Sequence, residues 1–535
     1  MQRLGRVVAA VGAASLLFSG GSVAPVRAGE AAPVPRAQCG PGSKPETGAQ
    51  GRVSAADEKS GRATQGYTCN MEVLSHFGST GGYRVHRYVD AAGHECAFYD
   101  TTLLFPTYVT TFNGPDRLTG VYVLDMSDPS HPVHTDTLLT PAMQSPHESV
   151  SLNAKRGLLA ADMGYPTFNP GFVDLYDVSQ DCRHPVLKSS TPLGILGHEG
   201  SFSPDGNTFW VSSTGGKTLT ALDVSNPSTP VPLFVDTRWV GHGFNLSDDG
   251  NRLYLADIAN FDPTAGLTIL DVSQVQKRVS NPQVPVVSHI SWPEVSIPQT
   301  NLPVTINGHP YLVEVDEFSR QISRDAKMPV GAARIIDIAD DTHPKVVSDI
   351  RLEVNTAAAR AGDQTKDEPF NPLQSYTAHY CSVPSRSEPG VVACSFILSG
   401  LRLFDIRDPY HPKEIAYANF PKASEQPDQP PSSYVMSAAA FVPERGEVWY
   451  SDGSSGFYAM KVTNRVWPFS QTTNVLGQTA TKAATPPASR AAPAPGASGA
   501  GRLAATGRTA PVGAALTLLV LALLVRRGRI GRIGR

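Results

Sequence analysis

One repeated pattern constrains the fold of this chain more than any other feature. An apolar segment that ends in Asp and runs into a Pro-rich turn recurs along the core, as in "VYVLDMSDPSHP" from Val121 and "LRLFDIRDPYHP" from Leu401. A seventh, more divergent copy begins at Phe457 and has Lys461 in place of the aspartate. The aspartates of the other six copies are Asp125, Asp177, Asp223, Asp271, Asp337 and Asp405. Repeats of this length, each with room for several short strands, are typical of propeller blades.

Each repeat predicts a blade of four strands. Upstream of the Asp-ending segment lie two strand candidates joined by hairpin turn chemistry, such as Pro204-Asp205-Gly206. An outer strand follows the Pro-rich turn. Seven copies therefore predict an all-β, seven-bladed β-propeller over residues 66–470. An open ring would leave exposed strand edges, so we expect "CNMEVLSHF" from Cys69 to cross back as the last strand of blade seven.

The repeats resemble those of the LVIVD-repeat β-propellers, a family of surface and secreted bacterial proteins. Segments such as "LTILDVS" from Leu267 carry this resemblance, which covers roughly residues 119–464. It implies a fold and a place at the cell surface, but no defined activity. Two insertions, 321–331 and 357–374, depart from the short repeat and are predicted to be surface loops.

The N-terminus predicts export. Arg3 and Arg6 precede an apolar run over 7–18, and Ala28 ends a small-residue cleavage sequence, so residues 1–28 read as a signal peptide. The composition of residues 29–65 predicts a loosely ordered segment.

The C-terminus resembles a sortase sorting signal of the LAxTG kind. Leu503, Thr506 and Gly507 belong to the pentapeptide, and an apolar run and an Arg-rich tail complete the signal over 503–535. The resemblance implies that a sortase cuts after Thr506 and joins the chain to peptidoglycan. The Ala-, Pro-, Thr- and Gly-rich stretch 471–502 is predicted to be a flexible spacer. We therefore expect an extracellular protein in the cell wall or on the surface of a Gram-positive-type bacterium, with membrane contact only before processing. A plain membrane anchor is the alternative.

Composition narrows the partners and the compartment. A formal net charge of −3 with 17% charged residues argues against nucleic-acid binding, which requires a basic surface. Six cysteines in an exported chain predict disulfides. Cys381 and Cys394 flank a turn-rich stretch and are expected to pair. The pairing of the other four stays open: Cys39, Cys69, Cys96 and Cys182.

The 14 histidines include two groups at repeated positions. The first group stands in the turns just before a proline, and we expect these to be turn residues on the blade rim: His131, His184, His343 and His411. The second group introduces the first strand of blades two, three, four and six: His147, His198, His242 and His379. The first strand of a blade is the innermost one, so these four side chains should converge near the axis.

Four converging imidazoles predict a metal site that shares one ion. Neutral imidazole binds Zn, Cu and Fe, and an acidic neighbour orients the ring by accepting its second N–H. Glu148 and Glu199, which follow His147 and His198, are predicted to take that role. Four axial histidines on a propeller are similar to the iron site of carotenoid-cleaving dioxygenases, but by analogy alone. The alternative is a set of channel histidines bonded to water and backbone.

Two functions remain open at this point. A wall-displayed binding module for an unknown surface ligand fits the repeats, the anchor and the spacer. A metal-dependent enzyme, such as an oxidoreductase, fits the second histidine group. The sequence does not decide whether the chain is an enzyme, because it holds no H-E-x-x-H helix, no G-x-S-x-G elbow and no Gly-rich phosphate loop.

Overall fold

The computed structural model describes residues 31–101, 120–164, 170–259, 264–318, 330–360, 375–423 and 431–469. The predicted signal peptide, spacer and sorting signal, with Leu503, Thr506 and Gly507, lie outside these residues, as do most of the insertions 321–331 and 357–374. Within the described part of the chain, none of the helices has the length and apolar character needed to cross a membrane.

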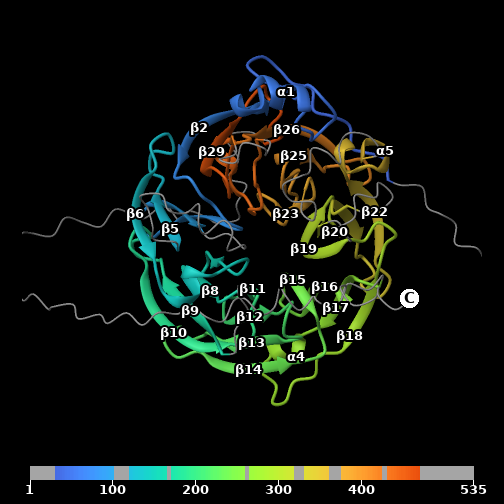
Figure 1. Ribbon diagram of the computed structural model, residues 1–535. Helices are drawn as coiled ribbons and strands as arrows, with labels where there is room; N and C mark the ends of the chain where they lie inside the picture. The colour runs from blue at the N-terminus through green and yellow to red at the C-terminus, as the bar shows by residue number, and fades with distance from the viewer. Residues whose placement is uncertain are drawn as a thin grey trace, which may run out of the picture. The chain divides into compact units, whose positions relative to one another are not determined.

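The structure confirms an all-β, seven-bladed propeller (Figure 1). Blade one is β3(Val85–Val89), β4(Glu95–Asp100), β5(Val121–Asp125) and β6(Val133–Leu138), and blade two is β7(Ser151–Asn153), β8(Leu158–Asp162), β9(Gly171–Asp177) and β10(Val186–Gly194). Blade three is β11(Glu199–Phe202), β12(Thr208–Ser212), β13(Leu219–Asp223) and β14(Val231–Asp236), and blade four is β15(Gly241–Leu246), β16(Arg252–Asp257), β17(Gly266–Asp271) and β18(Val286–Ile290). Blade five is β19(Ile297–Ile306), β20(His309–Glu317), β21(Ala333–Asp337) and β22(Lys345–Ile350). Blade six is β23(Ala378–Ser382), β24(Val391–Phe396), β25(Gly400–Asp405) and β26(Lys413–Asn419), extended by β1(Tyr67–Cys69). Blade seven is β27(Ala440–Val442), β28(Glu447–Asp452) and β29(Gly456–Val462), with β2(Met71–Phe77).

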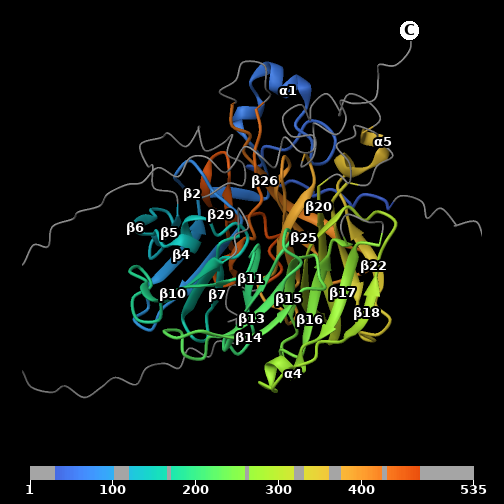
Figure 2. The same ribbon diagram turned by 60° about the horizontal axis from the view of Figure 1, so that its bottom comes forward.

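Neighbouring strands of every blade pair antiparallel, and the first strand of a blade lies innermost. Figure 1 shows β11, β15 and β23 close to the central axis and β14, β18 and β22 at the periphery. The helices are short: α1(Ala55–Ser60), α3(Pro141–Gln144), α4(Ser273–Gln276) and α5(Ala357–Arg360), with 3₁₀ turns η1(Ala63–Gln65), η3(Glu353–Asn355) and η4(Pro443–Arg445). Figure 2 shows α1 and α4 beyond opposite ends of the strands.

The repeated aspartate has a local cause. Each one ends the third strand of its blade, and its carboxylate accepts the backbone N–H two residues later, which fixes the following turn. The Ser127 N–H lies 2.9 Å from Asp125, and the Arg407 N–H lies 3.1 Å from Asp405. The same bond is made by Asp177, Asp223, Asp271 and Asp337. The repeat is therefore a strand-end signal.

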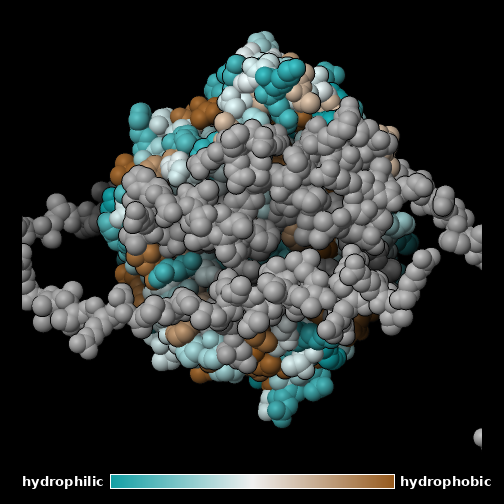
Figure 3. Space-filling model, in the orientation of Figure 1, coloured by the Kyte–Doolittle hydropathy of each residue, from teal (hydrophilic) through white to brown (hydrophobic). Residues whose placement is uncertain are grey.

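The core lies between adjacent blades rather than inside one. Phe98 and Val123 of blade one pack with Leu159 and Tyr176 of blade two in a single buried cluster. Burial of this kind stabilises by roughly 25 cal/mol for each Å² of apolar surface. Figure 3 shows apolar and polar patches interspersed over the described surface around the ring.

The N-terminal strands join blades six and seven. β1 pairs with β26, and β2 pairs with β29 in a register that runs from Met71↔Val462 to Phe77↔Phe457. Met71–Phe77 of the segment "CNMEVLSHF" thus lies at the outer edge of blade seven, whereas its first residue, Cys69, ends β1 at the edge of blade six.

Residues 31–65 differ from the loose order that their composition predicts. They carry α1, and the side chains of Val53 and Ala63 are buried. Glu46 pairs with the buried Arg402 guanidinium of β25. A disulfide to Cys69 and such polar contacts hold a segment that has few large apolar residues.

All six cysteines form disulfides. Cys381 and Cys394 pair across β23 and β24, as predicted. The open pairings are Cys39–Cys69 and Cys96–Cys182. The second of these ties blade one to blade two.

Candidate metal centre at the propeller axis

Four histidines from four blades meet at the axis. His147 precedes β7, His198 directly precedes β11, and His242 and His379 are the second residues of β15 and β23. All four are at most 8% exposed. His147 has φ 50°, a left-handed conformation that costs a non-glycine residue about 1–2 kcal/mol and is common at functional sites.

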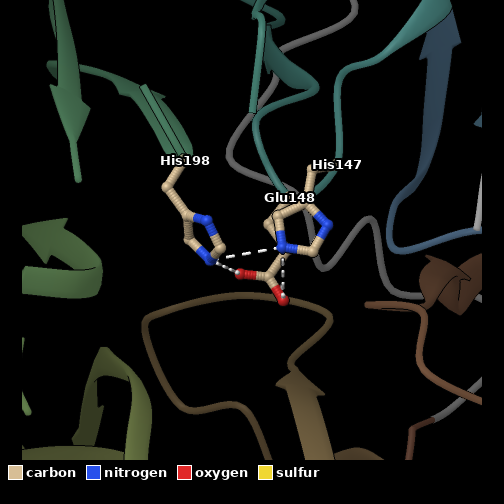
Figure 4. Close-up of side chains that lie close together, drawn as sticks. All are labelled: His147, Glu148 and His198. Carbon is tan, nitrogen blue, oxygen red and sulfur yellow. Dashed lines mark hydrogen bonds and ion pairs between the residues drawn. The ribbon is translucent and has the colours of Figure 1, made fainter. Parts of the chain in front are cut away.

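Glu148 lies at the centre of the four rings. Its carboxylate oxygens are 3.2 Å from Nε2 of His379, 3.4 Å from Nε2 of His198, 3.4 Å from Nε2 of His242 and 3.8 Å from Nε2 of His147. Figure 4 shows the His147 and His198 rings turned toward this carboxylate, and their Nε2 atoms are 3.2 Å apart. The predicted group of histidines thus lies together, with its Nε2 atoms directed at one buried anion.

A second carboxylate, Glu317, completes the cluster and was missed in the sequence. It ends β20 of blade five, which contributes no histidine to the cluster. Its oxygens lie 3.1 Å from Nε2 of His379 and 3.5 Å from Nε2 of His242. A signal existed: second strands end in acid in several blades, at Asp100, Asp162 and Asp452, and Glu317 stands at the matching end.

Backbone carbonyls fix the tautomers of two rings. Nδ1 of His242 donates to the Pro298 carbonyl at 3.0 Å, and Nδ1 of His379 donates to the Met436 carbonyl at 2.9 Å. A carbonyl oxygen can only accept, so each Nδ1 carries the hydrogen and each Nε2 faces the centre. This corrects the predicted role of Glu148, which faces the Nε2 atoms instead of accepting the second N–H of a ring.

The predicted role of Glu199 is also corrected. Its carboxylate accepts from Nη2 of Arg84 at 2.6 Å and from the Tyr380 hydroxyl at 3.0 Å. The Arg84 guanidinium lies over the Tyr380 ring at 4.1 Å, and its Nε donates to the Glu148 carbonyl at 3.0 Å. Glu199 therefore neutralises a cation that holds the Glu148 backbone.

The segment before β3 brings Tyr83 and Arg84 to the axis. The Tyr83 ring meets His147 edge-on at 4.5 Å and lies 5.4 Å from His379. Asp100 accepts both N–H groups of this segment, 2.8 Å from Tyr83 and 2.9 Å from Arg84. Gly82 permits this approach, since a Cβ there would lie 1.6 Å from the Asp100 carboxylate.

The electrostatics divide the four histidines into two pairs. Burial lowers the pKa of His242 and His379, but the carboxylates of Glu148 and Glu317 outweigh it and raise both pKa values to about 9. Burial dominates for His147 and His198, and their pKa values fall below 6.5. Without a metal, the cluster thus holds two imidazolium ions against two carboxylates.

The donor set fits a transition metal. Imidazole nitrogens and carboxylate oxygens are the ligands of Zn, Fe and Cu in proteins. Three buried atoms of the cluster, Glu148 Oε2, His198 Nδ1 and His379 Nε2, make no well-aligned hydrogen bond to any described residue. Glu148 Oε2 and His379 Nε2 are held by ion-pair contacts alone, without the aligned hydrogen bonds that buried polar atoms normally make, so both are available to an ion or water.

The other repeated histidines lie in the turns. His131, His343 and His411 are exposed, and each Nδ1 contacts the aspartate three residues earlier at 2.9–3.0 Å. The backbone N–H of His184 makes the matching turn bond to Asp181. None of these turns faces the axial cluster.

The LVIVD repeat model matches residues 116–140 and 213–234, the repeats of blades one and three. No curated protein matches the sequence. Solved structures similar to this chain include a putative 6-phosphogluconolactonase from Bacteroides uniformis, with 12% identity over 65% of this chain and 91% of that one, TM-score 0.44. A hydrazine synthase from Kuenenia stuttgartiensis has 10% identity over 72% and 96%, TM-score 0.45. A protein from Lactobacillus plantarum has 12% identity over 69% and 96%, TM-score 0.44. At these scores the likenesses carry no inference about function.

Proposed function

We propose that this chain is a cell-surface β-propeller that holds a transition metal at its axis and acts through that metal centre. One observation carries the proposal: four buried imidazoles from four blades direct Nε2 at two buried carboxylates. Metal-dependent chemistry therefore takes precedence over a pure binding role.

The backbone supports this interpretation over that of a simple ion-pair network. The Pro298 and Met436 carbonyls hold His242 and His379 in the tautomer that leaves Nε2 for a ligand. A metal replaces the two protons that these rings otherwise carry. Glu148 Oε2, which makes no well-aligned hydrogen bond to any described residue, gains a partner in the same step.

A bound ion would supply Lewis acidity, an acidified water or electron transfer. The chain's own residues do the rest. Glu148 and Glu317 provide the negative charge that retains a cation, and Arg84 holds the Glu148 backbone in place. The edge of Tyr83 closes one side of the cluster and keeps bulk water from the rings.

Metal content tests the proposal. The mature chain, grown with metal supplied, should contain transition metal at or above one ion per chain. His198→Ala should lower the content at least tenfold, because loss of even a residue that only supports a metal ligand typically costs about 10–100-fold in affinity. His411→Ala, in a turn, should leave it unchanged. A metal-free wild type, or equal loss in both variants, contradicts a metal centre.

We further propose that the propeller is exported and linked to the cell wall by sortase. The order of pentapeptide, apolar run and Arg-rich tail supports this, and three disulfides fit an oxidising compartment. Thr506→Ala should shift the protein from the wall to the membrane or the medium. If muralytic digestion releases wild-type protein that still carries the Arg-rich tail, the sortase route is wrong.

A second candidate function, binding of a surface ligand, is favoured by a cavity of about 350 Å³ between blades five and six. His309, Tyr311, Arg407 and Tyr410 line it, and Tyr410 is 52% exposed. Titration with soluble peptidoglycan fragments should show binding that Tyr410→Ala weakens. Equal binding by both proteins removes the cavity from consideration.

A further inference from the structure

We propose that the axial centre holds two metal ions bridged by the Glu148 carboxylate, rather than one ion shared by four histidines. This inference rests on the proposed function, since it concerns the number and arrangement of ions in the same cluster. It rests on the positions of the donor atoms and on the charge of the site.

The donors fall into two overlapping groups. His147, Glu148 and His198 have ligand atoms within 4.8 Å of one another, and so do Glu148, Glu317 and His379. Nε2 of His242 belongs beside the second group, because it lies 3.4 Å from Glu148 and 3.5 Å from Glu317. Glu148 is the member common to both.

The first group has the spacing of ligands on a single ion. Nε2 of His147 and Nε2 of His198 are 3.2 Å apart. Two nitrogens at metal–ligand distances of about 2.0–2.1 Å around a tetrahedral ion are separated by a similar amount. The second group, with two imidazoles and a carboxylate of its own, forms a separate ion site on the other side of Glu148.

The point equidistant from the four rings is already taken. The Glu148 carboxylate, 1% exposed, stands there and contacts every Nε2. A single central ion would have to displace it. Two ions on either side keep it in place, and each of its oxygens lies beside one histidine of each group: Oε1 beside His147 and His379, and Oε2 beside His198 and His242. Ions in two-metal sites lie about 3.5–4 Å apart.

The number of available ligands also favours two ions over one. One ion bound by four imidazoles and two carboxylates would be saturated. Two ions share these ligands as three donors (His147, His198 and Glu148) and four donors (His242, His379, Glu317 and Glu148). The first ion then keeps an open position, which is the usual condition for chemistry at a metal.

The charge of the site identifies the ligand for that position. Two divalent ions bring four positive charges against the two carboxylates, and Arg84 adds none because Glu199 neutralises it. Metal ions acidify bound water to a pKa near neutrality, so a hydroxide bridging the pair forms readily and lowers the excess charge. The proposed centre therefore takes two divalent first-row ions and one hydroxide.

Titration of the chelator-stripped mature chain with Co²⁺ tests the count. Bound cobalt is measured after desalting, and the visible absorption of Co²⁺ reports its ligands. We expect two ions per wild-type chain and one ion in Glu317→Ala, with the first group still loaded. Glu317→Gln, which keeps the side-chain shape, should also bind one. Thermal unfolding of each variant shows that it is folded.

A surface cluster provides the matched control. Asp90, His94 and Asp181 also gather ligand atoms, at the edge between blades one and two. His94→Ala should still bind two ions. A fall to one in His94→Ala would place the second ion at the surface and overturn the inference. One ion in the wild type overturns it as well but leaves the proposed metal centre standing, whereas no bound ion overturns both.

Discussion

Two sets of histidines occupy repeated positions in this propeller, and their surroundings are opposite. At the rim, His131, His343 and His411 are 77–83% exposed, and each meets the aspartate of its own turn; His343 also contacts the hydroxyl of the adjacent Thr342. At the axis, His379 is 1% exposed and meets two carboxylates from two other blades. Repetition places a side chain within its blade, but only closure of the ring decides which side chains from different blades meet.

The aspartates show the same contrast. Asp100 and Asp452 end inner-half strands, and burial raises the pKa of each carboxyl to about 7. Asp125 and Asp223 end third strands toward the rim. Burial raises the pKa of each carboxyl there too, but hydrogen bonds from Ser127 and Ser225 outweigh it and hold both pKa values below 3.8. The buried inner carboxyls thus hold their protons up to near-neutral pH, whereas the carboxyls near the rim are ionised.

The largest effect is expected from deleting an outer strand, because closure of the ring should depend on it although it lies at the rim. Deleting residues 69–77 removes β2, together with Cys69 and its disulfide to Cys39, and leaves the edge of β29 unpaired. We expect loss of cooperative unfolding and aggregation, measured by calorimetry and size-exclusion chromatography. Val73→Thr, at an exposed position of β2, keeps the backbone ladder and serves as the control. A monomeric deletion variant that unfolds cooperatively would show that the ring closes without this strand.

Next in size is the effect of removing the central carboxylate. Glu148→Ala leaves His242 and His379 without their main counter-charge, and breaking a buried ion pair typically costs about 3–5 kcal/mol. Chemical denaturation of the metal-free protein should show this loss. Asp408→Ala, which removes the carboxylate beside His411, should leave the denaturation midpoint unchanged. Similar midpoints for the two variants would erase the distinction between axis and rim.

A pH profile sharpens the contrast between the aspartates. Because the Asp452 pKa is raised in the folded state, its contribution to stability is complete below about pH 4 and is lost as the pH rises through 7. Asp452→Asn should remove this fall, about 4 kcal/mol for a pKa raised from 3.8 to about 7. The lowered pKa of Asp125 has the opposite sign, so its contribution is present above pH 4 and lost below it. Unfolding free energies from pH 3 to 8 for both asparagine variants measure the difference; parallel profiles would contradict it.

The smallest effect should come from the turn histidines. His343→Ala removes an exposed contact to Asp340, and exposed pairs of this kind contribute little. The thermal midpoint should move by less than about 1 °C. A shift of several degrees would mean that the rim turns help to hold the blades together.

Most of the fold can be predicted from the sequence, because each blade repeats the same strand-ending residues. Asp125 and its equivalents end a strand by a bond to the backbone two residues later, a local interaction that leaves a local trace. The axial histidines were readable for the same reason, since His198 and His242 stand at matching points of their repeats. Local chemistry thus predicts the elements and the inward-facing positions.

The rest of the site depends on contacts that no repeat encodes. Arg84 comes from the segment before β3, outside any Asp-ending motif, yet it captures Glu199 at the axis. Because the sequence pattern does not reveal Arg84 as the partner, it predicts that Glu199 accepts a hydrogen bond from a histidine ring. Glu317 ends a strand of blade five, which contributes no histidine to the cluster, so the histidine pattern does not point to it.

The pairing of Met71 with Val462 also governs when the molecule can finish folding. The ribosome makes the outer strand of blade seven first and its partner last, so the earliest strand stays unpaired until the remaining blades exist. Such distant pairing slows folding, because the entropy of closing a very long loop is lost before any contact forms. The cysteine at the start of this segment, Cys69, bonds to the nearby Cys39 and can be oxidised long before the ring closes. The chain thus contains a short disulfide-linked segment that can form early and that pairs with the final strand only when the ring closes.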